Sequence, residues 1–144
     1  MSCRFAWLKY YREIWLVDFE FRQPDGGLPE VHCMVARELR SGRIIRIWRD
    51  ELHAMSSPPF STGPGVLFVA YFSTAELNCF RSLNWPMPER ILDLFVEFRN
   101  HTNGYPPPFG NSLLGALLYF GESGIEAVQK EEMRQLAIRG GPFS

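Results

Sequence analysis

Two carboxylates lie two residues apart in an apolar segment that runs from Ile14 to Phe21. A β-strand alternates its side chains between two faces, so we expect Asp18 and Glu20 to point to the same side. Adjacent carboxylates repel each other and lose hydration, and a bound cation relieves both costs. The pattern therefore predicts a divalent-metal site, which is a common basis for phosphodiester hydrolysis. The alternative is the solvated face of a half-exposed strand.

Composition indicates an ordinary globular domain. The chain has 144 residues, of which 46% are hydrophobic and 22% charged, with a formal net charge of −1. This is enough chain for one domain with its own core. The strong basic excess that accompanies tight, sequence-independent binding to nucleic acid is absent. An enzyme that contacts only a few phosphates does not need such an excess.

Three well-separated cysteines (Cys3, Cys33 and Cys79) include no Cys-x-x-Cys spacing. This predicts neither a structural zinc site nor a disulfide framework, and it favours a reducing compartment. The sequence shows no signal peptide and no apolar run near the roughly 18 residues of a membrane span. We therefore expect a soluble cytoplasmic protein.

Hydrophobic patterning predicts an α/β domain with a mixed sheet. Strands are expected over residues 13–22, 31–39, 44–49, 66–71 and 90–94. Helices are expected from Ser73, over about 95–100, over 112–120 and over 125–139, and residues 50–65 are expected to form a loop. Arg40 to Arg43 is expected to close a β-hairpin.

This order of elements, with Val17-Asp18-Phe19-Glu20 as an Asp-x-Glu motif on the first strand, resembles the DEDD superfamily of 3′–5′ exonucleases. The resemblance covers roughly residues 14–139 and is greatest to the proofreading domain of DNA polymerase I-like (family A) proteins. It implies a ribonuclease H-like fold and a single-stranded 3′ end of DNA as substrate, with RNA not excluded and no membrane partner. It also implies two Mg²⁺ or Mn²⁺ ions, which prefer oxygen ligands.

The resemblance assigns roles to two further acids. Glu76 occupies the place of the Asp that opens a helix in the second family motif, and it would join Asp18 and Glu20 as a metal ligand. It also fits a capping box with Ser73, so both roles remain open. Asp93 follows a short strand and would complete the catalytic set, either by supporting the site or by binding a metal through water. Its alternative role is the N-cap of the next helix.

The third family motif, Tyr-x-x-x-Asp or His-x-x-x-Asp, is missing because no Asp follows Asp93. The family pattern would place it beyond residue 144, which predicts a domain truncated at its C-terminus. The alternative function is a catalytically inactive nuclease-fold module that binds nucleic acid or a protein partner. If the domain is truncated, apolar residues in 125–139 would be uncovered and would favour self-association.

Aromatic and basic side chains offer candidate contacts to the substrate. The aromatic residues nearest the motifs, and so the candidates for stacking on the terminal base, are Phe19, Phe21, Tyr71 and Phe72. Arginines crowd the expected hairpin between Arg37 and Arg49. They either follow a phosphate backbone or form a solvated surface.

Overall fold

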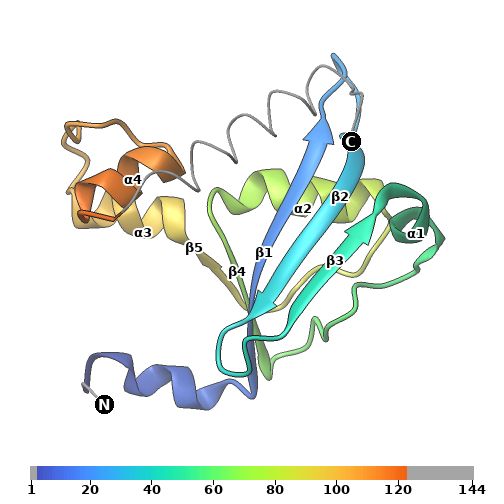
Figure 1. The fold of residues 1–144 in the computed structure, drawn as a ribbon, viewed down its shortest axis with the longest axis horizontal. Coiled ribbons are helices and arrows are strands. Elements are labelled where there is room, and N and C mark those ends of the chain that lie inside the picture. The colour runs from blue at the N-terminus through green and yellow to red at the C-terminus, as the bar shows by residue number, and fades with distance from the viewer. Residues whose placement is uncertain (1–2, 123–144) are drawn as a thin grey trace.

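The computed structural model describes residues 3–122 (Figure 1). In chain order its elements are η1 (Cys3–Tyr10), β1 (Glu13–Arg22), β2 (Glu30–Glu38), β3 (Ile44–Trp48), α1 (Arg49–Ala54), β4 (Val66–Ala70), α2 (Ser73–Ser82), β5 (Ile91–Asp93), α3 (Leu94–His101) and α4 (Leu113–Tyr119). The helix predicted over 125–139, and the self-association expected from it, lie outside the described residues.

The five strands form one mixed sheet in the order β3-β2-β1-β4-β5. β1 and β2 pair antiparallel, as do β2 and β3. β4 lies parallel to both β1 and β5. The prediction of an α/β fold with a mixed sheet is confirmed, and the strand order and directions are consistent with the ribonuclease H-like fold.

Alternation along β1 divides the core between the two faces of the sheet. Trp15, Val17 and Phe19 point to one face and join a large buried cluster that includes Phe80 of α2. Ile14 points to the other face and joins a smaller cluster. In Figure 1, α2 runs across the strands rather than along them, while α3 and α4 lie together beyond β5. α2 therefore reaches from the end of β4 to the far end of β1.

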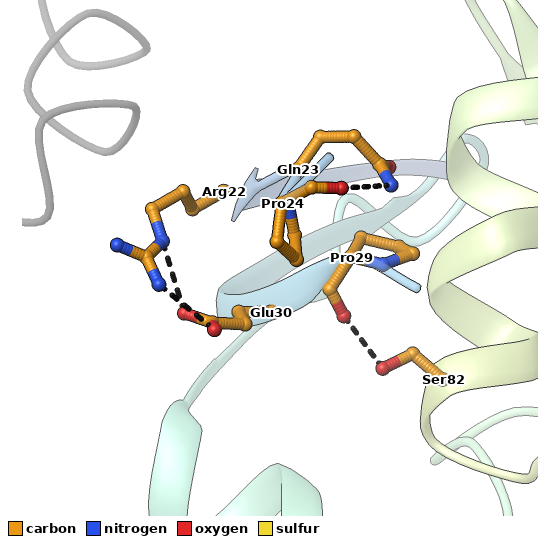
Figure 2. A network of polar contacts seen from close by, with 6 residues as sticks. All are labelled: Arg22, Gln23, Pro24, Pro29, Glu30 and Ser82. Atoms are coloured by element: carbon orange, nitrogen blue, oxygen red, sulfur yellow. Dashed lines mark hydrogen bonds and ion pairs between the residues drawn. The ribbon is translucent and has the colours of Figure 1, made fainter. Parts of the chain in front are cut away.

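The connection between β1 and β2 is fastened both to itself and to α2 (Figure 2). Arg22 and Glu30, which are cross-strand partners, form an exposed ion pair with a nitrogen–oxygen distance of 2.9 Å. The hydroxyl of Ser82 donates to the carbonyl of Pro29 at 2.6 Å. The second contact holds the last turn of α2 against the residue that precedes β2.

Two elements were not predicted from the sequence. α1 replaces the first part of the predicted loop, and Leu52 is its one buried residue. Six residues with a single apolar anchor are too few to show helical periodicity. η1 precedes β1 and packs Leu8 against the smaller core cluster. Between residues 3 and 122, no helix has the length and apolar character needed to cross a bilayer.

A buried carboxylate joins the start of β1 to the β2–β3 turn. The side chain of Glu38 is 4% exposed. It accepts hydrogen bonds from the backbone N–H of Ile14 at 3.0 Å, of Arg40 at 3.1 Å and of Ser41 at 2.8 Å. Burial alone would raise the pKa of Glu38, but these three N–H groups lower it to about 2. Glu38 is therefore ionised in the folded protein, and it holds the start of β1 against the β2–β3 turn.

Candidate functional site

The carboxylates of β1 lie on the sheet face that carries Ile14, opposite the large core cluster. Asp18 and Glu20 are half-buried, whereas the intervening Phe19 is buried on the other face. We call the side toward which these acids point the Asp18 face. Across the sheet, Asp18 pairs with Val35 of β2, and Glu20 pairs with Cys33. The predicted shared orientation of the two acids agrees with this burial pattern.

Glu76 reaches β1 from the first turn of α2. Its side chain is 4% exposed, and Oε2 accepts a hydrogen bond from the backbone N–H of Phe19 at 3.0 Å. β4 pairs with β1 only as far as Leu16, so the β4 strand does not supply an acceptor for Phe19. Glu76 takes that place, and its carboxylate therefore meets β1 at the residue between Asp18 and Glu20.

The capping box predicted for α2 does not form as expected. The N-cap residue is Phe72, whose side chain makes no capping hydrogen bond, and Ser73 is already the first helical residue. Instead, the first turn of α2 is held by partners distant in sequence, namely Asp93 and the Phe19 amide. Glu76 thus has a role in the scaffold that neither sequence interpretation included.

Two thiols, that of the buried Cys79 and that of the half-buried Cys33, have raised pKa values. The pKa of Cys79 in α2 is raised by burial and then by the carboxylates of Glu76, Asp18 and Glu20. The pKa of Cys33 is raised to about 11 by burial, with Glu20 and Asp18 adding to the effect. Both thiols remain protonated at neutral pH, which removes them as nucleophiles.

Asp93 fastens the starts of two helices. Oδ1 accepts from the N–H of Phe95 at 2.9 Å and of Val96 at 3.4 Å, so the predicted N-cap role for α3 is confirmed. Asp93 also accepts from the N–H of Phe72 at 3.0 Å and from the N–H and hydroxyl of Ser73 at 2.9 and 2.7 Å. Burial would raise the pKa of Asp93, but the bonds from Ser73, Phe72 and Phe95 lower it.

The four aromatic candidates for base stacking differ in how accessible they are. Phe19 is 3% exposed and packs against Phe80, which leaves no ring face for a base. Phe21 is half-buried against the large core cluster. Tyr71 is half-buried and its hydroxyl donates to the carbonyl of Asn111 at 2.5 Å. Phe72 alone among the four is exposed, at 48%.

Phe72 also adopts an unusual backbone conformation. Its φ of 67° lies in the left-handed region, which residues other than glycine rarely adopt. The bond from its N–H to Asp93 holds this conformation. Its ring meets that of Phe95 edge-on, with ring centres 5.3 Å apart. An exposed, strained aromatic residue therefore marks the turn between β4 and α2.

A cavity that the sequence did not reveal lies between α3 and α4. Its volume is about 640 Å³ and its walls are mainly apolar. Its lining includes Tyr71, Phe98, His101, Leu117 and Phe120. These residues come from separate elements, so no local pattern in the sequence could have indicated the cavity. Its size is in the range of small-molecule pockets.

The described acids do not fit a metal centre as they are arranged. Carboxylate oxygens have the right chemistry for Mg²⁺ or Mn²⁺. Within residues 3–122, however, no three His, Cys, Asp or Glu side chains are grouped so that they could hold an ion. Glu76 and Asp93 direct their oxygens to backbone N–H groups instead. The scaffold therefore competes with a metal for two of the four predicted site acids.

The structural role of Glu76 can be tested through stability. We expect Glu76→Leu to lower the free energy of unfolding by about 1–3 kcal/mol, because the buried N–H of Phe19 would lose its acceptor. Glu76→Gln keeps an oxygen acceptor and should lose less. Urea denaturation at pH 7 measures both, with the exposed Glu97→Gln in α3 as the control. Equal stability of Glu76→Leu and the wild type would contradict this role.

Comparison with known proteins finds no matching family model and no matching curated protein. Among solved structures, the EXO domain of Nibbler from Aedes aegypti is similar, with a TM-score of 0.46 and 17% sequence identity. The similarity covers 74% of this chain and 56% of that one. The chain thus spans just over half the length of the exonuclease domain it matches. A likeness this distant does not bear on activity.

Proposed function

We propose that this chain is a nuclease-fold module of the DEDD type that forms the acidic part of a 3′–5′ exonuclease site acting on DNA. One observation carries the proposal: Glu76, from α2, meets β1 at the N–H of Phe19, between Asp18 and Glu20. Carboxylates from two distant segments are thereby brought to the same stretch of β1, although within residues 3–122 they are not grouped closely enough to hold an ion. Acids drawn together around divalent ions are typical of sites that hydrolyse phosphodiester bonds.

The finer assignments belong to the same proposal. Asp18 and Glu20 are the half-buried acids and would face the substrate, with Mg²⁺ or Mn²⁺ as the cofactor. Glu76 could join them only by sharing or giving up its bond to Phe19. A proofreading role in DNA replication, within a DNA polymerase I-like protein, is supported by the Asp-x-Glu motif on the first strand. The cysteine pattern supports a cytoplasmic location.

A second candidate is a module of the same fold that binds nucleic acid or a protein without cleaving it. Two observations favour it. Asp93 is fully engaged in holding α2 and α3, and the described residues contain no grouped metal ligands.

Digestion of 5′-labelled single-stranded DNA with Mg²⁺ or Mn²⁺ separates the two candidates. For the exonuclease, we expect a ladder that shortens from the 3′ end and an Asp18→Ala variant at least about 100-fold slower. Asp25→Ala, in the exposed turn after β1, is the matched control and should digest normally. RNA of the same sequence tests the choice of sugar.

Three outcomes would count against the exonuclease. Digestion that Asp18→Ala leaves intact would place the activity elsewhere or in a contaminant. Shortening from the 5′ end would contradict the polarity. No digestion by a folded wild-type chain would favour the non-cleaving module. Isothermal titration calorimetry of Mn²⁺ into the wild type and into Asp18→Ala tests metal binding without relying on activity.

A further inference from the structure

The Asp18 face extends from β1 onto β2 and β3. Strand pairing aligns its side chains in three rows: Leu16, Arg37 and Ile44; Asp18, Val35 and Arg46; and Glu20, Cys33 and Trp48. The large core cluster, with α2 and the buried Leu52 of α1, packs on the opposite face. In Figure 1, β1 and β2 cross in front of α2.

The outer part of this face is exposed and combines apolar with basic side chains. We define the β2–β3 surface as Val35, Arg37, Ile44, Arg46 and Trp48. Trp48 is 61% exposed, Ile44 44% and Val35 41%. Arg37 and Arg46 are exposed as well, and within residues 3–122 neither forms an ion pair. With respect to the described part of the chain, the surface therefore presents two guanidinium groups without an ion pair beside a largely exposed indole.

Two other hairpin arginines, Arg40 and Arg43, do not share this availability. The guanidinium of Arg40 donates to the carbonyl of Tyr11 at 2.5 Å and to that of Leu8. Arg43 lies over the ring of Trp15, 4.9 Å from the ring centre. Of the basic residues predicted either to follow phosphates or to be solvated, Arg40 and Arg43 are thus engaged in the scaffold.

We propose that the β2–β3 surface binds single-stranded nucleic acid, with Arg37 and Arg46 contacting phosphates and Trp48 stacking on a base. The choice of ligand rests on the proposed function. Arg37 pairs with Ile44, which lies two residues before Arg46. The two arginines are therefore diagonal neighbours on adjacent strands, with their Cα atoms about 7–8 Å apart. Arginine forks match phosphate geometry, and exposed indoles stack on bases of any sequence.

Charge gives the bound strand a direction. The arginines lie on β2 and β3, whereas the acids Asp18 and Glu20 lie on β1 at the inner border of the same face. Phosphates are attracted to the outer strands and repelled near the acids unless a cation is present there. A strand held at Arg37 and Arg46 would therefore present its end, rather than its middle, to the acids.

Binding can be measured without hydrolysis by fluorescence anisotropy of a labelled oligothymidine in EDTA, using the full chain. We expect Arg37→Ala and Arg46→Ala each to weaken binding and to reduce the slope of log K against log salt by about 0.7. Trp48→Ala should weaken it roughly 5- to 150-fold, and Trp48→Phe should restore part of the loss. Exposed controls elsewhere are Arg81→Ala on α2 and Tyr105→Ala.

Three results would overturn the proposal. The first is that the wild type does not bind the oligonucleotide. The second is that Arg37→Ala, Arg46→Ala and Trp48→Ala bind it as tightly as the wild type does. The third is that Trp48→Ala loses a self-associated state while its oligonucleotide affinity is unchanged. The last would assign the surface to a second copy of the chain. If these variants digest DNA normally and bind it with unchanged affinity, this inference fails while the exonuclease proposal stands. Variant-dependent binding without any digestion would support it while the exonuclease proposal failed.

Discussion

Replacing Glu38 with alanine is expected to lower the free energy of unfolding by roughly 2–4 kcal/mol at pH 7. Three backbone N–H groups, those of Ile14, Arg40 and Ser41, lose a charged acceptor in a buried position. Urea denaturation measures the loss. Glu51→Ala, which changes an exposed glutamate in α1, is the control and should shift stability by less than about 0.5 kcal/mol.

The same carboxylate gives stability a defined pH dependence. The pKa of Glu38 falls from an ordinary value of 4.5 to about 2 in the folded chain, because the N–H groups outweigh the effect of burial. A lowered folded pKa means that the unfolded chain binds the proton more readily. The stabilisation is therefore complete above pH 4.5 and is lost as the pH falls toward 2.

Glu38→Gln isolates this contribution, because glutamine offers an oxygen acceptor but does not titrate. We expect the wild type to lose more stability than Glu38→Gln between pH 4.5 and 2, by roughly 2–3 kcal/mol. Stability curves measured at several pH values test this. Parallel curves for the two proteins over that interval would show that Glu38 is not the group responsible.

The strands could be predicted because their signals are local. β1 alternates apolar and polar residues, and its observed bounds, Glu13–Arg22, match the predicted ones. β4 is a run of five buried residues, as expected for a central strand. These two patterns, with a hairpin between them, were enough to predict a mixed sheet.

The site could be predicted less completely because its contacts join distant segments. The bond from Glu76 to Phe19 spans 57 residues, and the bonds from Asp93 to α2 span about 20. A sequence pattern such as a capping box considers partners only three residues apart. The cap of Asp93 on α3 is local, and it was the part that sequence reasoning identified.

Replacing Asp93 with alanine is expected to lower the free energy of unfolding by roughly 2–4 kcal/mol. It removes five hydrogen bonds and with them the anchor of two helix starts, each comparable to an N-cap in effect. Asp93→Asn keeps one acceptor oxygen, so its loss should be smaller. Asp25→Ala, an exposed aspartate in a turn, is the matched control, and a loss no larger than its own would refute the anchoring role.

Amide hydrogen exchange connects this anchor to the candidate site. Asp93 holds the N–H groups of Phe72 and Ser73, and so fixes the turn from which Glu76 reaches the N–H of Phe19. Loosening that turn should free the Phe19 amide, so we expect it to exchange faster in Asp93→Ala than global unfolding alone explains. The amide of Leu16, which lies on the same side of β1 as that of Ile14 and points toward β2, reports global unfolding. If the Phe19 and Leu16 amides lose protection equally, Asp93 stabilises the fold without positioning Glu76.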